Sequence, residues 1–178
     1  MKHATLGAII GLCLLSSGTV FAADGAKTKA DNVTVVFDHP EKFADVKDEF
    51  MGTDKGRDAI LEGIRTFITE RSASCLKEGQ KLDVKFTDID LAGEFEPQRG
   101  PNFDRVRIMK NIYAPRFDLE FKLTGADGKV LNEGKRTLRD SYYMDRMIAD
   151  KSDPLCYDKD ILNDWLRSDI KPKAAAAH

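Results

Sequence analysis

Histidine and cysteine are scarce in this sequence, with three of each in 178 residues. His3, His39 and His178 are too scattered to suggest a catalytic triad or a zinc site, and no two cysteines have the Cys-x-x-Cys spacing of a redox dithiol. The sequence also contains no Gly-x-Ser-x-Gly elbow and no phosphate-binding glycine loop. These absences argue against the enzyme classes that depend on such motifs, although they do not exclude every enzyme.

Long hydrophobic runs are also missing, except at the N-terminus, where residues 4–20 carry no charge. Lys2 and His3 precede this run, and Val20-Phe21-Ala22 follows it with small residues suited to a cleavage site. The pattern predicts a secretory signal peptide over residues 1–22, cleaved near Ala22, and no membrane span after cleavage. Lipidation at Cys13 is disfavoured because this cysteine follows the bulky Leu12 inside the apolar run.

Positively and negatively charged residues are present in nearly equal numbers. Loss of residues 1–22 removes Lys2 and no acid, leaving 156 residues with 27 Lys and Arg against 30 Asp and Glu. A near-neutral chain gives no electrostatic reason to expect a nucleic acid as partner. The length suits a single domain.

Two cysteines remain after cleavage, Cys75 and Cys156. An even pair in an oxidising compartment favours a disulfide between them, closing a long loop. The alternative is a pair of unrelated buried thiols.

Hydrophobic periodicity predicts the first half of the domain. A β-prone run at 33–37 predicts a strand, and apolar residues at helical spacing predict a helix from Asp54, capped by Thr53 or Asp54, towards Gly79. Residues 82–86 then alternate as a half-buried strand, but the apolar positions change parity at Ile89. This switch predicts a bulge or strand break near Thr87-Asp88.

The second half predicts a hairpin followed by helices. Residues 116–123 alternate cleanly, Gly125 to Gly128 form a turn, and the polar return strand at 129–140 is expected at a sheet edge. A short helix over 142–149 should bury Tyr143 and Met147. A last helix should begin at Asp153-Pro154 and end at Pro172.

These elements predict an α+β domain, with an antiparallel sheet of about four strands covered on one face by one long helix and C-terminal helices. The expected organisation is a signal peptide at 1–22, a flexible leader at 23–32, a single domain at 33–172 and a disordered tail at 173–178.

Four carboxylates lie within a short stretch without a basic residue: Asp88, Asp90, Glu94 and Glu96. Such a group can bind a hard cation, or supply the acid and base of a hydrolase, but solvated or structural carboxylates are the more common explanation. The next segment is basic, with Arg99, Arg105, Arg107, Lys110 and Arg116. These residues can receive an anionic ligand, or can pair internally with the acidic stretch, and we favour the internal network.

Several segments resemble one family of secreted proteobacterial proteins, the domain of unknown function 3016. They are Asp38 to Phe43, Thr87 to Pro97, Val106 to Ile108, Asn111 to Arg116, the Gly125 to Gly128 turn and Ser152 to Leu155. The resemblance covers nearly all of the chain after residue 22 and implies a periplasmic location. It brings no established activity, ligand or catalytic residue, and the two cysteines lie outside the shared motifs.

Our leading hypothesis is a non-enzymatic binding or accessory module of the cell envelope, without a cofactor, whose partner is an envelope protein or a small ligand. Its expected binding residues are Asp88, Asp90, Glu94, Glu96, Arg107, Tyr113 and Arg116. The alternative is a hydrolase or metal-dependent protein that uses the four carboxylates. A third alternative is a structural accessory protein without a discrete pocket.

Overall fold

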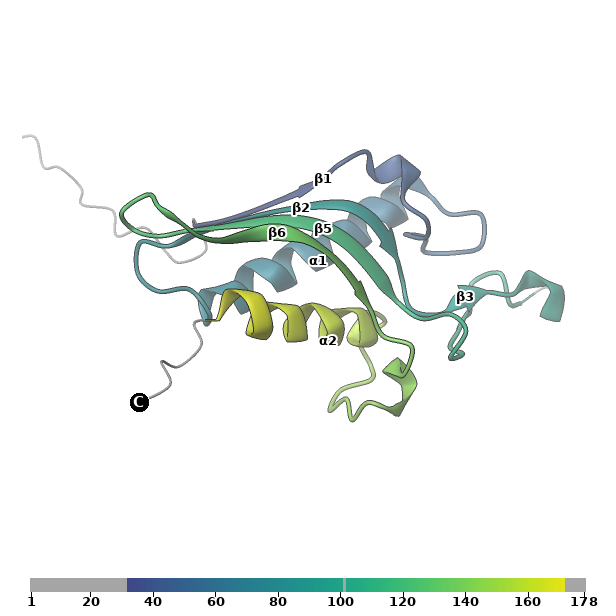
Figure 1. Cartoon of the computed structure of the whole chain (residues 1–178). Coiled ribbons are helices and arrows are strands. Elements are labelled where there is room, and N and C mark those ends of the chain that lie inside the picture. The colour runs from purple at the N-terminus through teal and green to yellow at the C-terminus, as the bar shows by residue number, and fades with distance from the viewer. Residues whose placement is uncertain (1–31, 101, 172–178) are drawn as a thin grey trace, which may run out of the picture.

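Two helices cover one face of a four-stranded sheet (Figure 1). The structure is a computed structural model that describes residues 32–100 and 102–171. The sheet has the order β1-β2-β5-β6, with strands β1 (Val33–Phe37), β2 (Lys81–Asp90), β5 (Arg116–Thr124) and β6 (Val130–Arg139). The helices are α1 (Asp54–Ala73) and α2 (Cys156–Trp165), and α2 continues into a π-helical turn, η5 (Leu166–Ile170).

Smaller elements lie at one end of the sheet. Strands β3 (Glu94–Phe95) and β4 (Arg107–Ile108) form a separate antiparallel pair. Three short 3-10 turns are η2 (Pro40–Lys42), η3 (Pro97–Arg99) and η4 (Tyr143–Asp145). We call this the loop end of the molecule, made by segments 43–53, 91–100, 102–115 and 140–155, opposite the β5–β6 turn in Figure 1.

The predicted α+β class is confirmed, and the sheet is mixed rather than wholly antiparallel. Strands β2, β5 and β6 pair antiparallel as predicted, whereas β1 pairs parallel to β2, with Val33 opposite Leu82. The reason lies in the connection: the 20 residues of α1 span about 30 Å and carry the chain back to the start of the next strand.

Alternating apolar residues of β2 and β5 face the helices and form the main core. Leu82, Phe86 and Phe117 have no exposed surface. The strand register shifts between Phe86 and Asp88, so the predicted bulge is confirmed. The extra residue keeps Ile89 on the buried face.

Helix α1 begins as predicted, because the Thr53 hydroxyl accepts a hydrogen bond from the Gly56 N–H at 2.9 Å. It ends at Ala73, earlier than predicted, and the chain turns before Gly79, whose φ of +74° suits glycine. Helix α2 begins at Cys156, two residues later than predicted, and the Asp153 side chain accepts a hydrogen bond from the Leu155 N–H at 2.9 Å just before it.

The predicted helix over 142–149 is only the η4 turn. Tyr143 is buried as expected, but Met147 is fully exposed, so its predicted burial was wrong. The chain leaves helical geometry at Arg146, whose guanidinium pairs with Asp160 of α2 at 2.8 Å. The backbone at Arg146 is extended, with φ −73° and ψ 141°, so Met147 no longer lies on the helical face that was expected to be buried.

The disulfide between Cys75 and Cys156 is not formed, and both thiols are free. Helices α1 and α2 run side by side in the same direction: the Phe67 ring lies 5.9 Å from Lys159 Nζ, and Arg71 hydrogen-bonds Asn163 at 3.0 Å. Cys75 follows the last turn of α1 and Cys156 opens α2, so about three helical turns separate them. A disulfide needs Cα atoms within about 7 Å.

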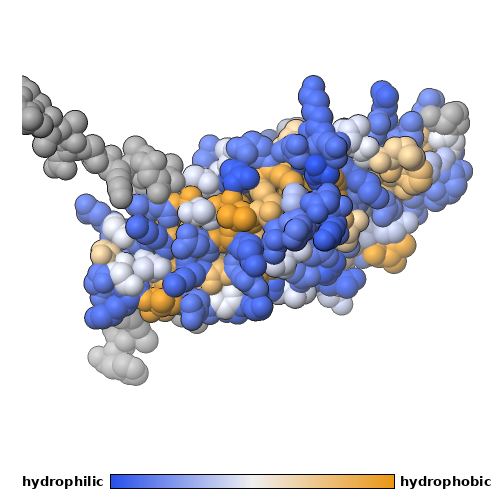
Figure 2. Space-filling model, turned by 90° about the horizontal axis from the view of Figure 1, so that it is seen from above, coloured by the Kyte–Doolittle hydropathy of each residue, from blue (hydrophilic) through white to orange (hydrophobic). Residues whose placement is uncertain are grey.

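The opposite face of the sheet carries charged side chains from alternate positions. Glu120 pairs there with Lys85 at 3.3 Å and Lys135 at 2.6 Å. Figure 2 looks down on this side and shows hydrophilic side chains around a smaller apolar area. Strand β6 is an edge strand, as its polar sequence predicted.

No described helix is long and apolar enough to span a membrane. The predicted signal peptide at 1–22 and tail at 173–178 lie outside the described residues, as do nearly all of the leader at 23–32 and the helix stop at Pro172.

Candidate functional site

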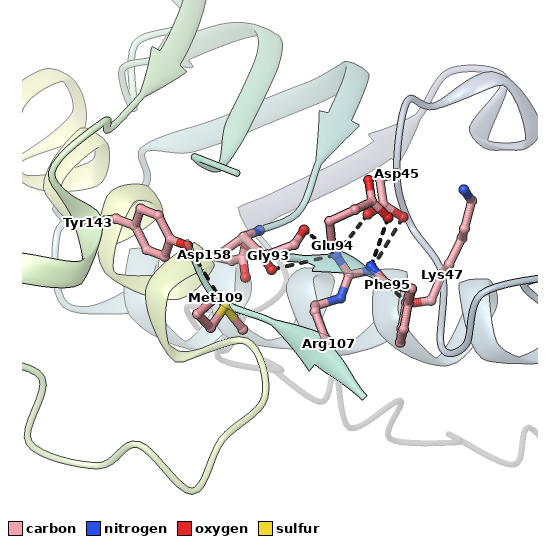
Figure 3. A network of polar contacts seen from close by, with 10 residues as sticks. Asp45, Lys47, Gly93, Glu94, Phe95, Arg107, Met109, Tyr143 and Asp158 are labelled. Carbon is pink, nitrogen blue, oxygen red and sulfur yellow. Dashed lines mark hydrogen bonds and ion pairs between the residues drawn. The ribbon is translucent and has the colours of Figure 1, made fainter. Parts of the chain in front are cut away.

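Arg107 of β4 holds three chain segments together at the loop end (Figure 3). Its guanidinium donates two hydrogen bonds to the Asp45 carboxylate, at 2.7 and 3.3 Å. It also donates to the backbone carbonyls of Gly93 at 2.9 Å and Lys47 at 3.1 Å. The guanidinium carbon lies 4.6 Å from the centre of the Phe95 ring. The terminal nitrogens of Arg107 are therefore engaged within the protein.

The backbone around Arg107 depends on Gly93. This residue has a φ of +81°, and a Cβ atom at this position would lie 2.7 Å from Met109 Sδ and 2.9 Å from Arg107 Cγ. Only glycine fits without displacing both side chains. The turn at Gly93 brings β3 against β4 and directs Arg107 towards Asp45.

A pocket of about 600 Å³ opens beside Arg107, between the loop end and the first turns of both helices. Its apolar lining consists of Ala59, Ile60, Leu91, Phe95, Met109, Pro154 and Leu155. Its charged lining consists of Lys47, Asp48, Arg105, Arg107, Asp153 and Asp158. We call this site the Arg107 pocket. Its volume and mostly apolar wall are typical of sites for small molecules or inserted side chains.

Asp158 of α2 is the most buried charged residue of this pocket, with 1% of its surface exposed. Its Oδ1 accepts a hydrogen bond from the Ala92 N–H at 3.0 Å. Burial raises the pKa of this carboxyl to about 7, although the Ala92 hydrogen bond and the nearby Arg107 charge oppose the rise. Asp158 therefore exchanges its proton near neutral pH, which is uncommon for an aspartate.

Tyr143 contacts Met109 of the pocket wall. Its hydroxyl donates to the Lys110 carbonyl at 2.9 Å, and its ring packs edge-on against Tyr157 at 4.9 Å. With Ala92 and Ala114 it forms a second, small core separate from the main one. This small core fixes the position of the loop end relative to α2.

The four carboxylates predicted as one group are divided between separate environments. Asp88 pairs with Arg116, which also pairs with Asp118. The Asp88 Oδ1 atom accepts from the Ala44 N–H at 2.8 Å, so this carboxylate ties the loop after β1 to β2. Asp90 lies next to Asp45 through a backbone bridge, and burial and the Asp45 charge raise its pKa.

Glu94 and Glu96 diverge after the turn at Gly93. Glu94 accepts a hydrogen bond from the Phe95 N–H at 2.9 Å. Glu96 is buried and accepts hydrogen bonds from Lys110, Arg99 and, at 2.7 Å, the Tyr113 hydroxyl. These contacts lower the pKa of Glu96 to about 2, and the hydrogen bond from Lys110 contributes most.

The favoured internal pairing of the acidic and basic stretches is present: Arg99 and Lys110 bind Glu96, and Arg116 binds Asp88. Arg107 and Arg105 pair instead with Asp45 and Glu49 of the earlier loop. Within residues 32–100 and 102–171, no cluster of three or more histidine, cysteine or acidic side chains is arranged to hold a metal ion.

Of the residues predicted to bind, only Arg107 lines the pocket. Asp45, Asp158 and Met109 were not anticipated. Asp158 left a signal in the sequence, because it shares the buried stripe of α2 with Ile161, Leu162 and Trp165. A charged residue on such a stripe calls for an explanation. Nothing in the sequence indicated the role of Asp45, because its partner Arg107 lies 62 residues away in the chain.

The fold and this site define a small α+β domain with a mixed sheet and a ligand-sized pocket at its loop end. A family model described as "Protein of unknown function (DUF3016)" matches residues 31–168, and the chain belongs to this family. The resemblance drawn from the sequence motifs is thereby confirmed. No curated protein and no solved structure matches the chain.

Proposed function

We propose that this protein is a non-enzymatic binding module of the bacterial periplasm, and that it receives part of an envelope protein in the Arg107 pocket. The observation that carries the proposal is the pocket itself, about 600 Å³ in volume, with seven apolar and six charged lining residues. Its wall is braced by Arg107, so the site exists before a ligand arrives. Preorganisation of this kind lowers the entropic cost of binding.

The surface beside the pocket favours a protein over a small molecule. Phe50, Met51 and Val106 are 43%, 82% and 44% exposed, and they lie close in the chain to pocket-lining residues. The two loops that carry them are joined by the Phe50 N–H to the Asp104 carbonyl at 2.7 Å. Exposed apolar side chains grouped around a pocket are typical of protein interfaces.

The chemistry of the lining favours binding over catalysis. Among the described residues that line the pocket, none is a serine, cysteine or histidine, so the pocket lacks the members of a Ser–His or Cys–His pair. The hydrolase alternative would need the four carboxylates to act together, whereas Glu96 and Asp88 are already bound to Lys110 and Arg116.

The location rests on the sequence pattern of residues 1–22 and on the family resemblance. A tagged copy carrying its own first 22 residues should be released by osmotic shock, with a mature chain that begins near Ala23. Retention in the cytoplasm with an intact N-terminus would contradict the proposed location.

The binding test is cross-linking in intact cells, followed by mass spectrometry of captured proteins. Ala59 is exposed at the mouth of the pocket, so Ala59→Trp should block entry without removing a core contact. Ala126→Trp, in the β5–β6 turn at the opposite end, is the matched control. We expect a partner captured by the wild type and Ala126→Trp but lost with Ala59→Trp. Capture that is unchanged by Ala59→Trp would reject the pocket as the binding site.

A further inference from the structure

Acidic groups outnumber basic groups among the charges held in and beside the Arg107 pocket. One cation, Arg107, lies near two buried acids, Asp45 and Asp158. Both terminal nitrogens of Arg107 are hydrogen-bonded to Asp45. Burying a carboxylate without its own counter-ion is costly, because the interior solvates charge poorly. Asp158 must therefore take up a proton or meet a cation from outside.

The other charged groups of the pocket do not supply that cation. In Figure 3, Lys47 points away from Asp158. Arg105 pairs with Glu49 at 3.2 Å. The two acids at the rim are also engaged: Asp48 accepts hydrogen bonds from Thr53, and Asp153 pairs with Lys159 at 2.6 Å. In the described parts of the chain, no lysine or arginine forms an ion pair with Asp158.

The rest of the lining suits a hydrocarbon stem. Leu91, Phe95, Met109 and Leu155 line the same pocket as Asp158. Methionine and aromatic side chains adapt well to a flexible apolar chain. A ligand that presents a charge at the end of several methylene groups would satisfy both the acid and the apolar wall.

We infer that the group entering this pocket is a primary amine on an apolar stem, as in a lysine side chain of the partner, and that its ammonium pairs with the Asp158 carboxylate. This inference rests on the proposed function and names the chemistry of its ligand. An ammonium needs only one acceptor oxygen, whereas a guanidinium fork pairs best with two, and Oδ1 of Asp158 is already shared with the Ala92 N–H.

The pairing makes binding depend on pH. Asp158 ionises as the pH rises through its pKa of about 7, whereas an alkylamine stays charged up to about pH 10. The amine should therefore bind more tightly at pH 8 than at pH 6. A neutral alcohol with the same stem gains nothing from this ionisation.

The test uses the full mature chain labelled with ¹⁵N, titrated at pH 8 with n-hexylamine or 1-hexanol. The Ala92 amide is the reporter, since its proton is bound to Asp158. We expect hexylamine to bind about tenfold more tightly than hexanol, and the amine affinity to fall when the pH is lowered to 6. Asp158→Asn should bring the two ligands to equal affinity, because the isosteric amide keeps the Ala92 hydrogen bond and lacks the charge.

Equal affinities of amine and alcohol for the wild type would overturn the assignment of Asp158. Absence of shifts at the pocket amides with hexylamine would overturn it as well. The pH dependence of the wild type decides the question independently if Asp158→Asn misfolds. Failure here is distinct from failure of the proposed function, which depends on the cross-linking difference between Ala59→Trp and Ala126→Trp.

Discussion

At the scale of single residues, burial gives two similar carboxylates opposite behaviour. Glu96 is buried among donors, so its charged form is stabilised and its pKa falls to about 2. At Asp158, burial outweighs the Ala92 hydrogen bond and the charge of Arg107, so the neutral form is stabilised and the pKa rises to about 7. The sign of the shift depends on whether the hydrogen bonds to the carboxylate outweigh its loss of solvation, as they do at Glu96, or the reverse, as at Asp158.

Asp158→Asn should change how stability depends on pH. The folded pKa of about 7 lies above the unfolded value of about 3.9, so the folded state holds the extra proton between these two values. Wild-type stability therefore falls as the pH rises through that window, by about 4 kcal/mol at most. The melting temperature of the variant relative to wild type should rise from pH 5 to about pH 7 and then level off.

The matched control is Asp83→Asn, a substitution at an exposed position on the open face of the sheet. Its melting temperature relative to wild type should stay constant over the same range. If the melting temperature of Asp158→Asn relative to wild type also stayed constant from pH 5 to pH 8, the Asp158 carboxyl would be ionised over this whole range.

At the scale of elements, the bulge in β2 is an extra residue that can be removed. Asp88, Ile89 and Asp90 oppose consecutive residues of β5, and only Thr87 has no opposing residue. Deleting Thr87 should leave the pairing on both sides intact, because Phe86 and Ile89 then fall on the same face of a regular strand. We expect a folded protein with a melting temperature within a few degrees of wild type.

Deletion of Lys85 is the corresponding control, since it also shortens β2 by one residue. It moves Phe86, which has no exposed surface, to the open face and puts Thr87 in its place. The cost should resemble a Phe→Ala change in a core, about 3–5 kcal/mol. Equal melting temperatures for the two deletions would show that the bulge does not set the register.

Most elements could be predicted because each buries one face, and burial leaves a period in the sequence. The hairpin, the bulge and the edge position of β6 follow from alternation and turn residues. The parallel pairing of β1 could not be predicted, because periodicity says which face of a strand is buried but not which strand lies beside it. Met147 was misplaced because the chain leaves helical geometry at Arg146, where it contacts α2, and a local pattern does not reveal such a distant contact.

The parallel course of α1 and α2 predicts the chemistry of the cysteines. Cys75 is buried and Cys156 is partly exposed. A chain lacking residues 1–22, purified without reductant, should take up one maleimide when folded and two after unfolding, as counted by intact-mass measurement. A chain that takes up none until it is reduced would contain the bridge.

At the scale of the whole molecule, the loop end is held by contacts between distant parts of the chain. Arg107 and Asp45 are 62 residues apart, and Asp158 and Ala92 are 66 apart. The charged stretches were visible in the sequence, but the choice of partners depends on how the loops fold back. The pocket could not be predicted for the same reason, since its lining comes from both helices and all four segments of the loop end.

The Arg107 contacts should couple the loop end to the main core. Arg107→Met leaves Asp45 buried without a partner, so the free energy of unfolding should fall by about 3–5 kcal/mol. Asp45→Asn combined with Arg107→Met removes both charges and should cost less than the single change. Arg105→Met is the control: its side chain is 78% exposed, so loss of its Glu49 pair should cost under about 1 kcal/mol.

Urea unfolding of these variants can be followed through Trp165, the sole tryptophan, which lies in the main core. If Arg107→Met left the Trp165 transition unchanged while amides near Gly93 lost their exchange protection, the loop end would be a separate unit that unfolds alone. A common shift of both would mean that the pocket and the core unfold together, so that a ligand bound at the loop end stabilises the entire domain.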